Sequence, residues 1–149
     1  MQAALRQICR KSAPARCGIY EKGSNVLKQV VLLKRRDGMS MDEFIDYYEN
    51  HHVKLGQRYM PLARRYVRRY VRPEKNPITG EIVELDFDVV MEIWWNTRQD
   101  FEETMRQIGA GEAHRLFYED EEKLFNSHNN RVFTVDEYES VMPAGLSDK

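Results

Sequence analysis

The chain contains little cysteine, which excludes the protein classes that cysteine defines. Only Cys9 and Cys17 occur among its 149 residues. Two cysteines are too few for a disulfide framework, and their spacing matches no zinc or redox motif. We therefore expect a reducing compartment, by default the cytoplasm.

Acidic residues are absent from the first 20 positions, which hold four basic residues. This composition resembles that of an organellar transit peptide, and equally that of a poorly structured start or an over-long reading frame. We predict a flexible basic tail over 1–27, one domain over 28–138 and a C-terminal tail over 139–149.

Long apolar runs and an excess of charge are also missing. The longest apolar patches, VVLL at 30–33 and VVMEIWW at 89–95, are far shorter than a membrane span. The net charge of -1 argues against nucleic acid or a membrane as the main partner. The sequence has no Walker loop, GxGxxG or GxSxG motif, so we predict no nucleotide or nicotinamide cofactor.

What remains is typical of a globular domain, with 42% apolar and 32% charged residues. Ser40 with Glu43, and Thr97 with Asp100, are spaced as capping boxes that begin helices. Hydrophobic periodicity completes the pattern. It predicts strands over 28–36, 64–72, 85–95 and 131–136, and helices over 40–56, 97–109 and 111–125.

This β-α-β-β-α-β order predicts an α+β, ferredoxin-like fold with a four-stranded antiparallel sheet. The predicted strand 85–95 has large apolar residues on both faces. Trp95 lies on one face and Trp94 on the other, which it shares with Asp88. The two helical regions cover one face only. We therefore expect a homodimer in which two sheets pack face to face.

Two of the four histidines are adjacent, in the segment YYENHHVKLGQRY at 47–59. On a helical wheel with Phe44 as origin, Tyr48, His51 and His52 lie within one apolar arc. Both imidazoles are thus expected to point toward the sheet. Two interpretations stay open: hydrogen-bonded core residues, or the polar wall of a pocket. Adjacent side chains on a helix diverge by about 100°, so we predict no metal site.

Six arginines and three tyrosines alternate between positions 58 and 72. Such a tract can form an RNA-binding surface. However, the strand 85–95 lacks the aromatic motif that RNA-binding ferredoxin-like sheets carry. We favour pairing of these arginines with the acids at 119–122, and expect no nucleic-acid partner.

A characteristic set of residues lies in the first predicted helix and near the end of the domain: Glu43, Phe44, Tyr47, Tyr48, His52, Val53, Lys54 and Leu55, then Asp120, Glu121 and Phe125. Through these residues, the segments from about 28 to 138 resemble EthD-domain proteins of the dimeric α/β-barrel superfamily. Tyr48 stands where the family commonly has tryptophan, and Lys54 where it commonly has proline.

The resemblance implies a dimer with a pocket between helices and sheet in each subunit. His52 matches the family position and is the predicted general acid/base, with Tyr48 as proton donor or anchor and His51 assisting. The predicted substrate-binding residues are Phe44, Tyr47 and Trp94.

The implied function is acid/base chemistry without metal or flavin on a small aromatic or polyketide-like substrate: a phenol, quinol, lactone or β-keto compound. Oxidoreductase, isomerase and lyase or cyclase activities remain open, because fold membership does not fix a reaction. The alternative is a non-catalytic dimeric accessory protein that carries an aromatic ligand for an oxygenase system. A haem-degrading relative is a third possibility.

Overall fold

The computed structural model describes residues 20–22 and 26–140. The chain divides into two compact units, one spanning 24–136 and one made from both chain ends. In the second unit, β1 (Tyr20–Lys22) pairs antiparallel with β6 (Tyr138–Ser140). Cys9, Cys17 and most of the predicted basic tail lie outside the described residues, so the predictions made there stay predictions.

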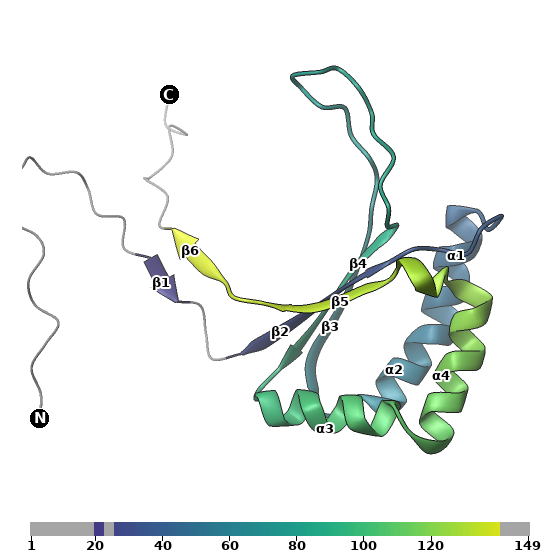
Figure 1. The fold of residues 1–149 in the computed structure, drawn as a ribbon, viewed down its shortest axis with the longest axis vertical. Helices are drawn as coiled ribbons and strands as arrows, with labels where there is room; N and C mark the ends of the chain where they lie inside the picture. The colour runs from purple at the N-terminus through teal and green to yellow at the C-terminus, as the bar shows by residue number, and fades with distance from the viewer. Residues whose placement is uncertain (1–19, 23–25, 141–149) are drawn as a thin grey trace, which may run out of the picture. The chain divides into compact units, whose positions relative to one another are not determined.

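A four-stranded antiparallel sheet forms the larger unit (Figure 1). Its strands follow the order β3-β4-β2-β5. They are β2 (Leu27–Leu33), β3 (Ala63–Tyr70), β4 (Val89–Trp95) and β5 (Arg131–Val135). The two longest apolar segments of the sequence therefore pair in the centre of the sheet, where burial rewards them most.

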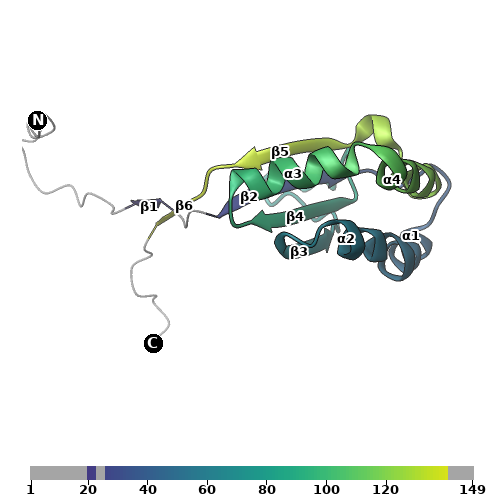
Figure 2. The same cartoon turned by 90° about the horizontal axis from the view of Figure 1, so that it is seen from below.

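Helices cover one face of this sheet (Figure 2). The first helical region comprises α1 (Met41–Tyr47), a wide turn over Tyr48–His52 and α2 (Val53–Tyr59). The second comprises α3 (Arg98–Ile108) and α4 (Gly111–Leu124), followed by a short 3₁₀ turn over Ser127–Asn129. The β-α-β-β-α-β order and the ferredoxin-like α+β fold are thus confirmed.

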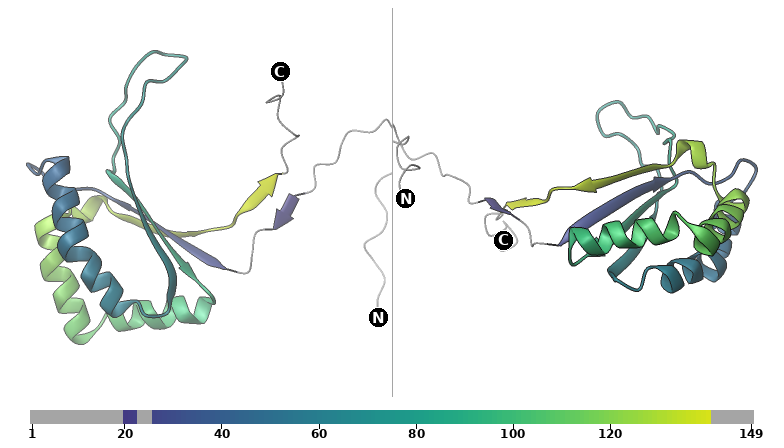
Figure 3. Two further views of the ribbon diagram at one scale, coloured as in Figure 1. Left: turned by 180° about the vertical axis from the view of Figure 1, so that it is seen from behind. Right: turned by 60° about the horizontal axis from the view of Figure 1, so that its bottom comes forward.

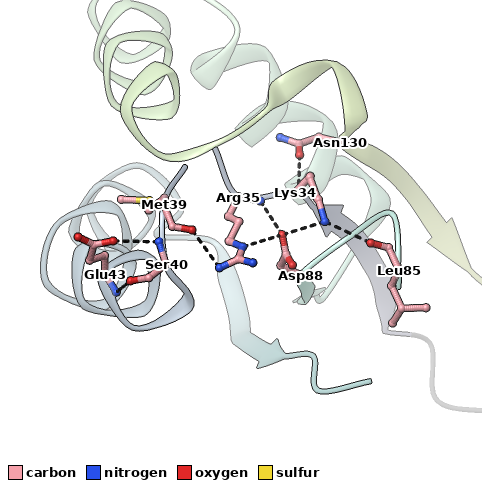
Figure 4. Close-up of polar contacts among 8 residues, drawn as sticks. All are labelled: Lys34, Arg35, Met39, Ser40, Glu43, Leu85, Asp88 and Asn130. Atoms are coloured by element: carbon pink, nitrogen blue, oxygen red, sulfur yellow. Dashed lines mark hydrogen bonds and ion pairs between the residues drawn. The ribbon is translucent and has the colours of Figure 1, made fainter. Parts of the chain in front are cut away.

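Both predicted helix starts are correct. Ser40 accepts a hydrogen bond from the Glu43 amide, and the Glu43 carboxylate accepts one from the Ser40 amide (Figure 4). Thr97 caps α3 through the Asp100 amide at 3.0 Å. Each cap satisfies amides that a helix N-terminus leaves unpaired.

Two strands are shorter than predicted because side chains replace ladder contacts at the same end of the sheet. Asp88 lies just before β4, and its carboxylate accepts the Arg35 amide at 3.0 Å and pairs with Lys34 at 3.4 Å (Figure 4). The Lys34 amide donates to the Asn130 side chain. Because of this polar cluster, β4 begins only at Val89 and β2 ends at Leu33.

The core lies between the sheet and the helices. Its largest fully buried side chains include Trp95, Tyr48, Phe44 and Ile93. Phe44 meets Tyr48, Tyr70 and Phe125 edge to face, with ring centroids 5.8–6.2 Å apart. Such aromatic pairs fix ring orientation as well as burying area.

No helix of residues 26–136 covers the opposite face of the sheet (Figure 3). Val30, Leu32 and Trp94 are only half-buried there, and Phe133 is 42% exposed. The long connection between β3 and β4 extends away from the sheet and carries three exposed aliphatic side chains, Ile78, Ile82 and Val83.

Candidate functional site

The site is built on a distortion of the first helical region. Residues Tyr48–His52 form a π turn, in which the Val53 amide donates to the Tyr48 carbonyl five residues earlier. A π turn adds one residue to a helix and is frequent at functional sites. It changes which side chains of the segment 47–59 face the sheet.

The extra residue corrects the prediction that both histidines point inward. Buried positions recur every four residues, at Phe44, Tyr48, His52 and Gly56, because the wide turn delays the helical phase. His51 is exposed, and its ring lies against Tyr47 at 4.8 Å. His52 is buried at 5% exposure. The structure brings His52 to the site and leaves His51 at the surface.

An acid on α4 orients the His52 ring. The Nδ1 atom of His52 lies 2.7 Å from Oδ2 of Asp120, and the Tyr47 hydroxyl donates to Oδ1 of Asp120 at 2.8 Å. Burial opposes ionisation of Asp120, but hydrogen bonds from His52 and Tyr47 outweigh it and lower the pKa of the carboxyl. An ionised Asp120 places the imidazole proton on Nδ1 and leaves Nε2 as a base.

Tyr48 is fully buried, and its hydroxyl lies 3.1 Å from the Tyr66 hydroxyl and 3.2 Å from the Met91 sulfur. Burial raises the pKa of both phenols, so both keep their protons. Tyr66 lines the cavity beside His52, and Tyr48 does not. The structure therefore places the Tyr66 hydroxyl, which was not predicted, at the site, with the Tyr48 hydroxyl bonded to it.

A cavity of about 350 Å³ lies between the helices and the sheet. It is lined by His52, Tyr66 and Glu121, by aliphatic side chains of β2 and β4, and by three methionines, Met60, Met91 and Met105. Val132 of β5 also lines it and is 63% exposed, so the cavity reaches solvent beside β5. Its size suits a small organic ligand.

Gly56 makes room for this wall. A Cβ atom at this position would lie 2.8 Å from the Tyr66 ring and 2.9 Å from the Met60 methyl group. The helix continues through Gly56 to Tyr59, so the prediction that it ends at Gly56 is wrong. The glycine serves close packing of Tyr66 rather than helix termination.

The three predicted substrate-binding residues lie in three different places. Phe44 is in the core with no exposed surface. Tyr47 lines a shallow outer depression with His51 and Asp120. Trp94 lies on the uncovered face of the sheet, where its indole donates to Glu92 and Lys28 and Arg65 stack on its ring. None of the three lines the His52 cavity.

Two arginines of the basic tract pair with acids other than those at 119–122, where pairing was predicted. Arg68 makes a two-bond pair with Glu49 at 2.7 and 3.1 Å, and Arg69 pairs with Glu92 at 3.1 Å. β3 is an edge strand beside β4 and near the π turn, which brings Glu92 and Glu49 within reach. The tract is thus partly neutralised within the domain.

Within residues 20–22 and 26–140, no group of three or more histidine, cysteine, aspartate or glutamate side chains could hold a metal ion. No helix in the same part of the chain is both long and apolar enough to cross a membrane.

The sequence predicted no catalytic or substrate-binding role for Asp120, Glu121 or Tyr66, although a signal for the two acids was present. Along α4, Ala113, Phe117, Asp120, Glu121 and Leu124 follow helical spacing on one face. Acids at apolar positions of such a stripe are costly unless they serve a site. Tyr66 gave no comparable signal, since it belongs to a strand of alternating tyrosine, valine and arginine.

The EthD domain profile matches residues 36–128 of the chain. No protein with a curated description matches the chain. Among solved structures, an EthD family protein from Bacillus halodurans is similar at 17% identity and a TM-score of 0.52, covering 75% of this chain and 98% of its own.

Two further solved structures have comparable similarity. A NIPSNAP family protein of unknown function from Agrobacterium tumefaciens has 9% identity and a TM-score of 0.50, with 80% of this chain and 94% of its own covered. An EthD-like protein from Ralstonia eutropha has 13% identity and a TM-score of 0.49, with 84% and 99% covered. At these identities the structural likeness describes the fold alone.

Proposed function

Because the chain belongs to the EthD family, we propose that it is a small-molecule enzyme in which His52 transfers protons to and from an apolar substrate. The single observation that supports this is the His52–Asp120 pair beside a largely apolar cavity that His52 lines. Asp120 occupies Nδ1, and Nε2 is the ring nitrogen left for a ligand. An acid-oriented imidazole of this kind is a general base.

The substrate classes that fit are phenols, quinols, lactones and β-keto compounds, whose O–H or C–H protons an imidazole can remove. Proton transfer of this type accelerates a reaction by about two to four orders of magnitude. That suffices for a substrate already activated by its own carbonyl or aromatic ring. Tyr66, with Tyr48 behind it, supplies a neutral hydroxyl as anchor.

The test is a thermal-shift panel of one phenol, one quinol, one lactone and one β-keto ester, followed by product analysis of any that binds. A ligand present at 100 times its Kd stabilises by about 2.7 kcal/mol, or a rise in Tm of about 5–10 °C for a domain of this size. The matched variants are His52→Ala at the cavity and His51→Ala, its exposed neighbour.

We expect one class to bind and to yield product in the wild type and in His51→Ala, but not in His52→Ala. Binding that survives both substitutions and gives no product would instead support a carrier of aromatic ligands. A response to haemin or to short RNA alone, added as further members of the panel, would exclude both functions.

We also propose that the protein is a homodimer in which the uncovered faces of two sheets pack together. The supporting observation is the apolar character of that face, where Phe133 is 42% and Val135 is 37% exposed beside Val30 and Leu32. Contiguous exposed apolar surface of this kind marks an interaction site.

Light scattering at several concentrations tests the dimer with two aspartate substitutions. Phe133→Asp on the sheet face should yield monomers. Tyr118→Asp changes an aromatic residue with 60% exposure on α4 and should leave the dimer intact. Equal masses for both variants, or a monomeric wild type, would refute this arrangement.

A further inference from the structure

Glu121 is an acid in the same cavity as His52 to which the proposed function gives no role. It lies on α4 directly after Asp120 and lines the cavity. Unlike Asp120, its carboxyl group takes part in no hydrogen bond or ion pair within the described part of the chain. A half-buried acid without a partner is costly for structure alone, which indicates another reason for its position.

The surroundings of Glu121 favour its protonated form. Burial raises the pKa of Glu121, the neighbouring His52 opposes this rise, and the neighbouring anion Asp120 adds to it. The other titratable group facing it is Tyr66 on β3. None of the described residues that line the cavity is a lysine or an arginine, so no fixed cation is present there to hold a carboxylate.

We infer that Glu121 is the second proton-transfer group of the cavity, donating its proton to the carbonyl oxygen of an uncharged ketone while His52 removes a proton from the adjacent carbon. This deepens the proposed function and rests on it.

In this step the C–H bond breaks and its proton moves to Nε2 of His52. The electron pair forms the carbon–carbon double bond, and the carbonyl π pair takes the proton of Glu121. The product is the enol, with no change of oxidation state and no further reactant. Return of both protons restores the two side chains.

Tyr66 is a weaker candidate for the acid. Its pKa is raised above that of an ordinary phenol, and its hydroxyl already shares a hydrogen bond with Tyr48. A carboxylic acid is the stronger proton donor even when burial raises its pKa, since the two groups start roughly six units apart. Tyr66 is better placed to accept or orient than to donate.

The same wall defines the substrate class. An anionic substrate would find no lysine or arginine among the residues that line the cavity, whereas an uncharged ring meets aliphatic side chains and the thioethers of Met60, Met91 and Met105. Methionine adapts to irregular apolar shapes. The cavity therefore fits a neutral cyclic or aromatic ketone.

The experiment follows deuterium exchange at the α-carbon of 2-tetralone, a neutral apolar ketone, by NMR in D₂O with the full chain. The variants are His52→Ala, Glu121→Gln and, as matched control, Glu119→Gln. Glu119 precedes Asp120 on the same helix and pairs with Arg115 at the surface. Binding of 2-tetralone and thermal melting are measured for each protein.

We expect the wild type and Glu119→Gln to catalyse exchange and His52→Ala to abolish it. Glu121→Gln should bind 2-tetralone within about threefold of wild type but exchange it roughly 10- to 100-fold more slowly. As pH rises, wild-type exchange should fall when Glu121 loses its proton, and Glu121→Gln should lack this fall.

Exchange that requires His52 and is unchanged in Glu121→Gln would overturn the role of Glu121 and leave the proposed function standing. Equal loss of binding and exchange in Glu121→Gln would also overturn it, because the residue would then serve only to bind. No exchange by the wild type above the His52→Ala level would overturn both.

Discussion

A double-mutant cycle on His52 and Asp120 tests whether this pair is the structural centre of the site. Each residue is replaced by alanine, singly and together, and the free energy of unfolding is measured for all four proteins. The cycle isolates the coupling between the two side chains from the effect of each substitution alone.

The geometry predicts a large coupling. The two side chains are 7% and 13% exposed, and their atoms lie 2.7 Å apart. A hydrogen bond to a charged group contributes about 1.5–3 kcal/mol when it is shielded from water. We expect a coupling of about 2 kcal/mol, near the middle of that range.

A second cycle on the same helix is the control. Arg115 and Glu119 lie 3.0 Å apart, but their side chains are 57% and 52% exposed. Exposed pairs of this spacing contribute about 0.3–0.5 kcal/mol. The two pairs each place one carboxylate on α4 opposite a nitrogen at a similar distance, but His52–Asp120 is buried and joins two segments, whereas Arg115–Glu119 is exposed and lies within one helix.

Urea unfolding followed by circular dichroism, at one protein concentration for all variants, provides both cycles. Equal slopes against urea would establish that the unfolded states are comparable. A His52–Asp120 coupling no larger than that of Arg115–Glu119 would refute the buried pair, and with it the orientation of the imidazole.

Three further predictions concern the same region. Because hydrogen bonds lower the pKa of Asp120, its contribution to stability is complete above the unfolded-state value of about 3.9 and is lost as pH falls through the lower folded-state value. Asp120→Ala should therefore lose less unfolding free energy than wild type in acid titrations. Gly56→Ala gains about 1 kcal/mol of helix propensity but crowds Tyr66 at 2.8 Å, which costs about 1–3 kcal/mol. Its Tm should not rise, and a rise would contradict the close contact. Deleting the exposed Asn50 removes the extra residue of the π turn and should leave a folded protein by circular dichroism. Deleting the exposed Arg115 from the regular helix α4 rotates the rest of α4 by about 100° and should unfold it.

Much of the fold follows from the sequence because local signals agree with tertiary demands. Ser40 and Thr97 mark helix starts through bonds made within three residues, so no distant contact is needed to predict them. The two central strands, β2 and β4, contain enough apolar residues for a strand to be predicted from the sequence alone. Strand ends were less accurate, because Asp88 binds Lys34 and Arg35, more than 50 residues away in the sequence.

The site was harder to predict because its geometry depends on a single extra residue. A wheel of 3.6 residues per turn places His51 at the centre of the inward arc and His52 toward its edge. The π turn reverses this order, and nothing in the letters YENHH distinguishes a π turn from a regular helix. The resemblance to EthD proteins pointed to His52, whereas periodicity alone favoured its neighbour.

The π turn also explains how one short segment serves both the core and the site. In an undistorted helix that buried Phe44 and Tyr48, His51 would point inward in place of His52. The inward imidazole would then not lie opposite Asp120 of α4. Delaying the phase by one residue keeps the aromatic core and brings the next imidazole to 2.7 Å from that carboxylate. The distortion forgoes regular helical hydrogen bonds over five residues. That cost is easier to understand if the position of the His52 ring matters more than helix stability, since local strain concentrates where structure is tied to function.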